Sequence, residues 1–178
     1  LSIPADVQPT DAESIFSQAL GAHDRSIWRV LSYDPTLDRY LEYGFDPNFP
    51  GILPGRAYWL SMRDKQAVSL TLEGELADQN SELRIPLLPG YNQFGTQFLF
   101  PVAFDSVEVE KDGQRMGILD AARNSWVSNQ LWYVDPMTDY YKYDTAGFGR
   151  VMTIDPWQGY WMYANEAVTL ILPPAPYE

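Results

Sequence analysis

The sequence repeats itself: a series of short blocks in its first half returns, in the same order, in its second half. The paired blocks are residues 1–4 and 83–86, 34–40 and 135–141, 54–59 and 156–161, and 67–72 and 167–172. Three of the four pairs lie nearly the same distance apart along the chain, about 100 residues. Self-similarity at a fixed spacing is typical of a structural unit that occurs twice. The repeat therefore predicts two related units.

The spacing of the blocks also predicts where each unit begins and ends. We expect residues 1–74 to form the first unit, residues 75–82 a polar linker, residues 83–174 the second unit and residues 175–178 a tail. The first pair of blocks is spaced differently, so the second unit carries about 19 extra residues, within residues 91–126. Residues 1–4 resemble the end of a strand, and we expect the chain to be a processed product or a fragment of something longer.

Composition and turn residues indicate an all-β fold with one or two short helices. Aromatic residues make up 15% of the chain, which also contains 14 Pro and 12 Gly, as expected for short strands joined by tight turns. Residues 28–33 and 131–134 lead into Asp-Pro turns and residues 40–43 and 140–143 leave them, the pattern of a hairpin. Residues 68–72 and 168–172 predict one further strand in each unit. We expect the two units to be sandwich-like or barrel-like.

One further hairpin and two helices are predicted outside the repeated blocks. Residues 107–110 alternate apolar and acidic side chains and lead into Asp112-Gly113, so the insertion is expected to add a hairpin. Thr10 and Glu13 have the spacing of a capping box, which predicts a helix that Gly21 closes. A weaker pattern predicts a short helix near residues 120–123.

Charge and the lack of cysteine exclude several classes of partner and site. The chain has 24 acidic and 12 basic side chains, a formal charge of −12, which repels phosphate backbones. Nucleic acid and anionic membranes are therefore not expected as partners, and the apolar stretch 98–104 is far too short to span a bilayer. A chain with no cysteine forms no disulfide, thiolate zinc site or cysteine nucleophile.

The repeated motifs resemble those of a tandem β-rich module found in exported and cell-surface bacterial proteins. Such modules open on a Gly-Trp-Asn-Leu-Ile-Ser-Leu-Pro-like strand and continue through a Tyr-Asp-Pro turn and a Pro-Gly-x-Gly-Tyr-Trp strand. Residues 89–95 and 100–107 are similar to Pro-Gly-Trp-Asn-Leu-Ile-Gly and Pro-Val-x-Trp-x-x-Val segments of one variant. Ala57 and Tyr91 depart from these motifs, and the first unit lacks the opening Gly-Trp-Asn. The resemblance implies an extracellular or cell-surface accessory module, with no established activity.

Aromatic residues are the main candidates for a contact surface. A residue that recurs in both units most simply serves the shared fold, so we expect the repeated tryptophans to be buried with their N–H groups paired. These structural repeat positions are Asp34, Pro35, Tyr58, Trp59, Asp135, Pro136, Tyr160 and Trp161. Aromatic residues without a match are freer to contact a sugar or a protein, although each also suits a hydrophobic core. The ligand or interface candidates are Trp28, Trp126, Trp132, Tyr140, Tyr143, Trp157 and Tyr163.

Metal binding and catalysis have little support in the sequence. Asp34 with Asp38, and Asp135 with Asp139, place two carboxylates across a turn, which is too few to hold calcium unaided, so we expect them to cap turn amides. His23 is the only histidine, and no nucleophile elbow, phosphate-binding loop or multi-histidine metal motif is present. We expect no catalytic residues and no cofactor.

These observations favour a non-catalytic structural or protein-interaction module of a secreted or cell-surface bacterial protein. Its partners would be other extracellular subunits or further domains of the same polypeptide. Residues 107–118 of the insertion would supply contacts and be removable without loss of the fold. The alternative function is carbohydrate binding through exposed aromatic rings, for which glycans would be the partner.

Overall fold

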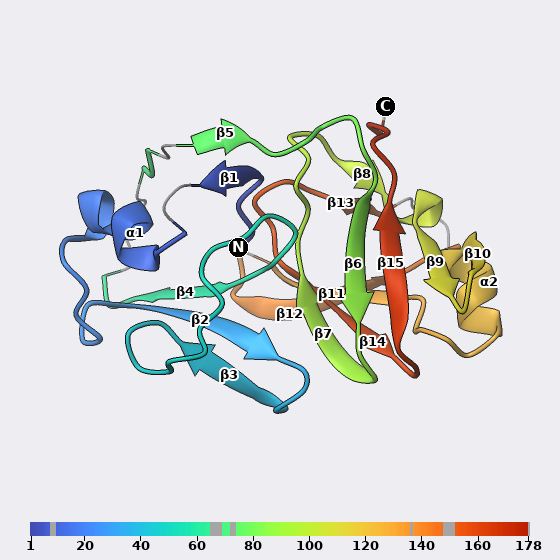
Figure 1. Ribbon diagram of the computed structural model, residues 1–178, viewed down its shortest axis with the longest axis horizontal. Helices are drawn as coiled ribbons and strands as arrows, with labels where there is room; N and C mark the ends of the chain where they lie inside the picture. Colours follow the sequence, from blue (N-terminus) through green and yellow to red (C-terminus); the bar gives the residue numbers. More distant parts are fainter. Residues whose placement is uncertain (8–9, 65–68, 72–73, 136, 148–151, 178) are drawn as a thin grey trace.

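The computed structural model describes residues 1–7, 10–64, 69–71, 74–135, 137–147 and 152–177. The first half of the chain forms β1 (Ala5–Val7), α1 (Ala12–Leu20), β2 (Trp28–Asp34), β3 (Arg39–Glu42), β4 (Trp59–Met62) and β5 (Gly74–Leu76). The second half forms β6 (Leu83–Leu87), β7 (Gly90–Phe94), β8 (Val102–Ala103), η1 (Phe104–Ser106), β9 (Glu108–Lys111), β10 (Gln114–Gly117), α2 (Ile118–Arg123), β11 (Gln130–Asp135), β12 (Tyr140–Thr145), β13 (Thr153–Ile154), β14 (Tyr160–Ala164) and β15 (Val168–Leu172). The two halves lie side by side (Figure 1).

The second half is a sandwich of two four-stranded antiparallel sheets. One sheet has the order β10-β9-β15-β6 and the other the order β12-β11-β14-β7. Their inner faces share one hydrophobic core, to which Val109 and Leu170 contribute from one sheet and Leu131 and Met162 from the other, all fully buried. The sheets of the described residues do not close into a barrel. The all-β, sandwich-like prediction is therefore confirmed, and the barrel alternative is not.

The first half has a smaller core of its own. Its main sheet has the order β3-β2-β4, and β1 pairs with β5 in a separate two-stranded sheet. Ile15 and Phe16 of α1 pack into this core with Trp28 and Val30 of β2, because the helix turns its apolar face toward the sheet.

The two halves share a three-strand pattern. The order β3-β2-β4 in the first half matches the order β12-β11-β14 in the second. The Tyr58 hydroxyl accepts a hydrogen bond from the Leu53 N–H (2.9 Å) and donates to the Gly51 carbonyl (2.7 Å). The Tyr160 hydroxyl does the same, at the same sequence separations, with the Asp155 N–H (2.8 Å) and the Thr153 carbonyl (3.3 Å). Both side chains are 1% exposed. Each therefore ties a strand to the loop before it.

The two Asp-Pro turns also match. The carboxylate of Asp34 accepts a hydrogen bond from the Thr36 N–H (2.8 Å), and that of Asp135 accepts one from the Met137 N–H (2.8 Å). Asp38 and Asp139 both adopt the left-handed backbone conformation, with φ of 50° and 58°. Pro136 lies outside the described residues.

The strand predicted at residues 68–72 is not found where the structure can test it. Residues 69–71 are outside any strand, and Val68 and Leu72 lie outside the described residues. In the second half the equivalent strand, β15, is held on one side by β6 and on the other by β9. Because β9 belongs to the insertion, the first half has no counterpart to support a strand on that side.

Both predicted helices are present, but the first begins differently from the prediction. Asp11, not Thr10, is the N-cap of α1, and its carboxylate accepts a hydrogen bond from the Ser14 N–H (3.1 Å). The Thr10 carbonyl instead accepts a hydrogen bond from the Ile52 N–H (2.8 Å), so this residue pairs with a neighbouring segment. Gly21 closes the helix as predicted, with φ of 79°. The short helix α2 is confirmed at Ile118–Arg123.

The insertion forms the predicted hairpin, β9 and β10, joined through Asp112 and Gly113. Both turn residues have positive φ, 50° and 77°, as a two-residue hairpin turn requires. The hairpin is not an appendage, because Val107, Val109 and Ile118 are fully buried and β9 pairs with the central strand β15. This burial and pairing argue against the prediction that residues 107–118 can be removed without loss of the fold.

Candidate ligand-binding groove

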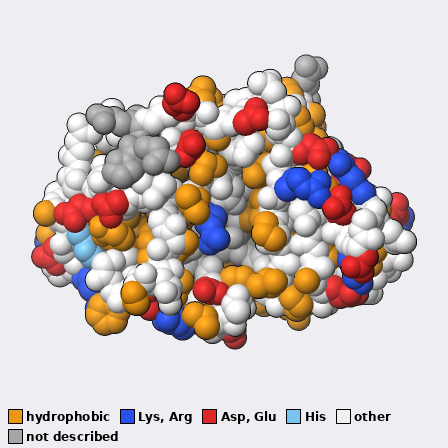
Figure 2. All heavy atoms as spheres, in the orientation of Figure 1, with side chains coloured by type: hydrophobic (Ala, Val, Ile, Leu, Met, Phe, Trp, Pro, Cys, Tyr) orange, Lys and Arg blue, Asp and Glu red, His pale blue; other side chains and the backbone are white. Residues whose placement is uncertain are grey.

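The outer faces of the two large sheets carry different chemistry. On the sheet that contains β6 and β9, Arg84 pairs with Glu110 (2.7 Å), and Arg115 pairs with Glu82 (2.6 Å) and with Glu108. Figure 2 shows acidic and basic side chains mixed together on the right of the molecule, the side on which Figure 1 places β6 and β9. An outer sheet face of paired charges is well solvated.

The outer face of the other sheet is aromatic instead. Trp132 lies directly opposite Tyr143 on one side and Trp161 on the other, while Tyr163 lies opposite Tyr91. Because alternate residues of a strand point to opposite faces and the residues between these belong to the core, all five rings point outward. Tyr141 extends the row along β12. This surface, named here the aromatic face, consists of Tyr91, Trp132, Tyr141, Tyr143, Trp161 and Tyr163.

Two tyrosines of the first half complete a groove at one end of the aromatic face. The groove has a volume of about 280 Å³ and is lined by Tyr33, Tyr40, Tyr91, Trp132, Tyr141 and Trp161. Tyr33 lies near the end of β2, and its backbone N–H donates a hydrogen bond to the side-chain oxygen of Gln93, on β7 of the second half (3.2 Å). The groove therefore exists only because the two halves pack together.

The ring contacts across this junction come in matched pairs. Trp59 contacts Tyr141 at 6.2 Å and 78°, and Trp161 contacts Tyr40 at 6.2 Å and 81°. Trp59 and Trp161 are equivalent positions of the repeat, as are Tyr40 and Tyr141. The tryptophan of each half thus contacts the tyrosine of the other half. This is an isologous contact of the kind found in two-fold dimers.

The prediction for the repeated Tyr-Trp pairs is right for one residue and wrong for the other. Tyr58 and Tyr160 are buried structural residues, whereas Trp59 and Trp161 are half-buried on the opposite side of their strands. The Trp59 N–H donates to the Tyr40 hydroxyl (3.0 Å), and Trp161 lines the groove. The residues that recur in both units therefore serve two purposes. Tyr58 and Tyr160 belong to the core of each half, whereas Trp59 and Trp161 contact the other half.

Most hydroxyl groups around the groove already have partners. Tyr33 donates to the Asp38 carboxylate, and Tyr141 bonds to Tyr40. Burial, followed by the bond to Asp38, raises the pKa of Tyr33 to about 12, and burial raises the pKa of Tyr40 and Tyr141. These phenols are therefore neutral at physiological pH. Among the described residues, the indole N–H groups of Trp132 and Trp161 have no hydrogen-bond partner.

The structure divides the unmatched aromatic candidates into three groups. Trp28 and Trp126 are buried, 1% and 8% exposed, so their placement among ligand candidates is wrong. The Trp28 N–H donates to the Gly21 carbonyl (3.1 Å). Tyr140 and Trp157 are exposed but do not line the groove. The remaining candidates belong to the aromatic face; they are Trp132, Tyr143 and Tyr163.

Five groove residues were not among the ligand or interface candidates: Tyr33, Tyr40, Tyr91, Tyr141 and Trp161, the last of which was predicted to be structural. The available signal was the spacing of two between Tyr141 and Tyr143 along one predicted strand, which places both rings on the same face. Sequence spacing gave no sign that residues 33 and 40 would lie beside residue 161.

Of the four aspartates considered for calcium, Asp34 and Asp135 cap turn amides as predicted, whereas Asp38 accepts the Tyr33 hydroxyl instead. Lys142 pairs with Asp135. Asp139 also has an interaction partner. Within the described ranges, no group of three or more His, Asp or Glu side chains is placed to hold a metal ion.

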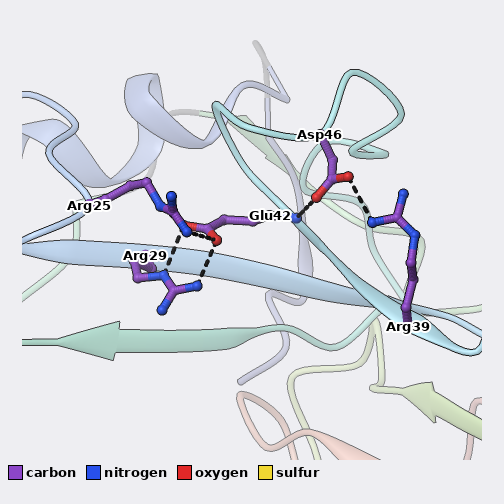
Figure 3. A network of polar contacts seen from close by, with 5 residues as sticks. All are labelled: Arg25, Arg29, Arg39, Glu42 and Asp46. Atoms are coloured by element: carbon purple, nitrogen blue, oxygen red, sulfur yellow. Dashed lines mark hydrogen bonds and ion pairs between the residues drawn. The ribbon is translucent and has the colours of Figure 1, made fainter.

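His23 and Glu42 are two polar side chains of the first half that are held in place by contacts within the fold. His23 lies between the rings of Trp28 (4.7 Å) and Tyr43 (5.0 Å), and its Nε2 has no hydrogen-bond partner in the described part of the chain. Glu42, 5% exposed, accepts hydrogen bonds from Arg25 and Arg29, and its backbone N–H donates to Asp46, as Figure 3 shows. The hydrogen bonds from Arg29, together with those from Arg25, outweigh burial and lower the pKa of Glu42 to about 2.

No helix among the described residues is long and apolar enough to cross a membrane. The cell-surface location implied by the family resemblance stays a prediction. No protein-family model, curated protein or solved structure matches this chain.

Proposed function

We propose that this chain is a non-catalytic protein-interaction module of a secreted or cell-surface bacterial protein, and that the groove and the aromatic face are its contact surface. The observation that carries the proposal is the exposure of aromatic rings on the outer side of a sheet. Tyr91, Tyr141 and Tyr143 are 52%, 54% and 52% exposed. Large, contiguous apolar patches are uncommon on monomeric proteins and mark binding sites when they occur.

The composition of the surface supports binding more than packing within the chain. Tyrosine and tryptophan are the residues most enriched where proteins bind one another, because each buries a large area at a small cost in side-chain entropy. The outer face of the opposite sheet carries paired charges instead. Contact through the aromatic face also agrees with the acidic character of the chain, since it needs no positive charge.

The test is affinity capture from the extracellular and surface fractions of the source, with Trp161→Ala as the disruptive variant. Trp161 lines the groove and lies at the centre of the aromatic face. Tyr140→Ala is the matched control, because Tyr140 is exposed on the same strand as Tyr141 but does not line the groove. A partner retained by the parent and by Tyr140→Ala should be lost by Trp161→Ala. Equal retention by all three chains would refute the groove as contact surface.

Carbohydrate binding is the second candidate, and the pair Trp132 and Tyr143 favours it. Their rings are 4.5 Å apart and inclined by 36°, the flattest pair on the aromatic face. The Trp132 N–H, which has no partner among the described residues, can donate to a sugar hydroxyl. A glycan array with the parent chain and Trp132→Ala tests this candidate. Absence of any glycan bound by the parent removes it.

A further inference from the structure

Three of the six rings that line the groove stand steeply to one another. The planes of Tyr33 and Tyr40 meet at 70°, those of Tyr33 and Trp161 at 67°, and those of Tyr40 and Trp161 at 81°. Their centroids are 5.5, 4.9 and 6.2 Å apart, respectively. The groove thus has a corner of three rings, and Tyr91, Trp132 and Tyr141 line the rest of it. Steep rings around one space can direct several π-faces toward a single cation.

The charges near the groove favour a cation. Among the described residues, no Lys or Arg side chain lines it. Asp38 accepts the hydroxyl proton of Tyr33, which places a carboxylate at the edge of the three-ring corner. Two cations that adjoin groove residues in the sequence are paired elsewhere, Arg39 with Asp46 (2.9 Å) and Lys142 with Asp135. The whole chain carries a formal charge of −12, so its long-range field also attracts cations.

The polar groups of the groove indicate which kind of cation fits. A primary ammonium or a guanidinium brings three or five N–H donors that need acceptors once water is removed. The only side-chain oxygens in the described lining of the groove are phenol hydroxyls, and those of Tyr33, Tyr40 and Tyr141 already take part in hydrogen bonds. The Asp38 carboxylate is not part of that lining and already accepts the Tyr33 hydroxyl. A quaternary ammonium has no N–H, a diffuse charge and a methylated surface, and so requires no acceptor. Its desolvation is correspondingly less costly.

We propose that the groove binds a trimethylammonium group, held against Tyr33, Tyr40 and Trp161. The inference rests on the proposed function, since it takes the groove as the contact surface and names the chemistry that this surface recognises. Two sources present such a group: a choline head group and a trimethylated lysine side chain. The groove is open to solvent, so a group at the end of a flexible stem can enter it.

Isothermal titration of the full chain with small probes tests the proposal. The probes are tetramethylammonium, choline, phosphocholine, Nε-trimethyl-lysine and the neutral isostere 3,3-dimethylbutan-1-ol. Tetramethylammonium and choline should bind saturably, and the isostere should bind about tenfold more weakly, because it has the same shape without the charge. Tighter binding of trimethyl-lysine would point to a protein partner, and tighter binding of choline or phosphocholine to a head group. An isostere that binds as tightly as choline would overturn the proposal.

Variants test whether the ammonium probes bind in the groove. Trp161→Ala should weaken choline binding by about tenfold, and Tyr140→Ala should leave it unchanged. Asp38→Asn keeps every ring and should weaken binding several-fold, with a smaller dependence on salt, which keeps the test decisive if Trp161→Ala does not fold. If no ammonium probe binds while Trp161→Ala still loses its captured partner, the trimethylammonium inference fails and the proposed function stands. If Trp161→Ala keeps its partner, the proposed function fails on its own evidence.

Discussion

Glu42 shows how one buried carboxylate organises charged neighbours in the first half. It accepts four hydrogen bonds from the guanidinium groups of Arg25 and Arg29, at 2.6–2.8 Å. The two arginine side chains are 48% and 40% exposed, whereas the Glu42 side chain is only 7% exposed. The carboxylate therefore depends on the two cations, which themselves remain partly hydrated.

Replacing this carboxylate should make stability less dependent on pH. The pKa of Glu42 falls from 4.5 to about 2 on folding, so its contribution is present above about pH 4.5 and is lost as the pH falls toward 2. Glu42→Gln should lower the free energy of unfolding by roughly 2 kcal/mol at pH 7, and the gap to the parent should narrow as the pH falls from about 4.5 to about 2. Urea denaturation at several pH values measures this. A gap that stays constant would contradict it.

Glu110→Gln is the control for that series. Glu110 pairs with Arg84 on a solvated sheet face, where its side chain is 33% exposed. Its loss should change stability by less than about 1 kcal/mol at every pH, because exposed ion pairs contribute little.

The matched tyrosines Tyr58 and Tyr160 should each matter through one hydroxyl. Tyr160→Phe leaves the Asp155 N–H and the Thr153 carbonyl without this partner and should destabilise the protein by about 1–3 kcal/mol. Tyr58→Phe should act similarly in the first half. Tyr163→Phe, on the exposed face, is the comparison and should be nearly neutral. The midpoints of urea denaturation for the three variants measure these differences in stability. A Tyr160→Phe chain as stable as the parent would refute the structural role of the hydroxyl.

At the scale of elements, local sequence patterns predicted turns and strands better than pairing. Asp112-Gly113 defined its hairpin because both residues must adopt positive φ, which few other pairs tolerate. Local sequence also predicted correctly that Gly21 ends α1. Thr10 was misassigned as the N-cap of this helix; Asp11 is the N-cap, and the Thr10 carbonyl accepts a hydrogen bond from the N–H of residue 52. Residues 69–71 have an alternating pattern without a strand. A strand needs neighbours, and the sequence of one segment does not supply them.

Removal of the β9–β10 hairpin should unfold the second half. Residues 108–117 contribute a strand that pairs with β15, and the flanking Val107 and Ile118 are fully buried. A chain in which a short Gly-Ser linker replaces these residues should lose cooperative unfolding, as monitored by far-UV circular dichroism. Gln114→Ala, an exposed change within β10, should retain it. A folded deletion chain would mean that the hairpin is peripheral after all.

For the whole molecule, the contact between the halves is close-packed and relies on small residues. A Cβ at Gly95 would lie 2.1 Å from the Cβ of Ser2 and 3.2 Å from the Arg56 carbonyl oxygen. The Gly95 N–H donates to the Gly55 carbonyl (3.0 Å), and the Ser2 N–H donates to the Trp157 carbonyl (3.1 Å). Backbone from the two halves thus meets directly, without side chains between.

Gly95→Ala should therefore destabilise the junction by about 1–3 kcal/mol or more, as overpacking does. Adding Ser2→Gly removes the closest clashing atom and should restore part of that loss, giving a favourable coupling energy in a double-mutant cycle. Gly117→Ala, where a Cβ meets nothing within 4 Å, is the control. Thermal unfolding of the four chains provides the energies. Additive effects of the two changes would argue against the contact.

Sequence patterns were enough to predict the β-rich class, the Asp-Pro and Asp-Gly turns, the hairpin in the insertion and the similarity of the two halves. These depend on local backbone preferences and on comparison of the chain with itself. The folded arrangement was needed to learn that Trp59 and Trp161 lie at the junction, and that Tyr33 and Tyr40 complete a groove with Tyr91. Strand order brings together residues far apart in the chain, and the two halves pack through surfaces whose partners no local pattern specifies.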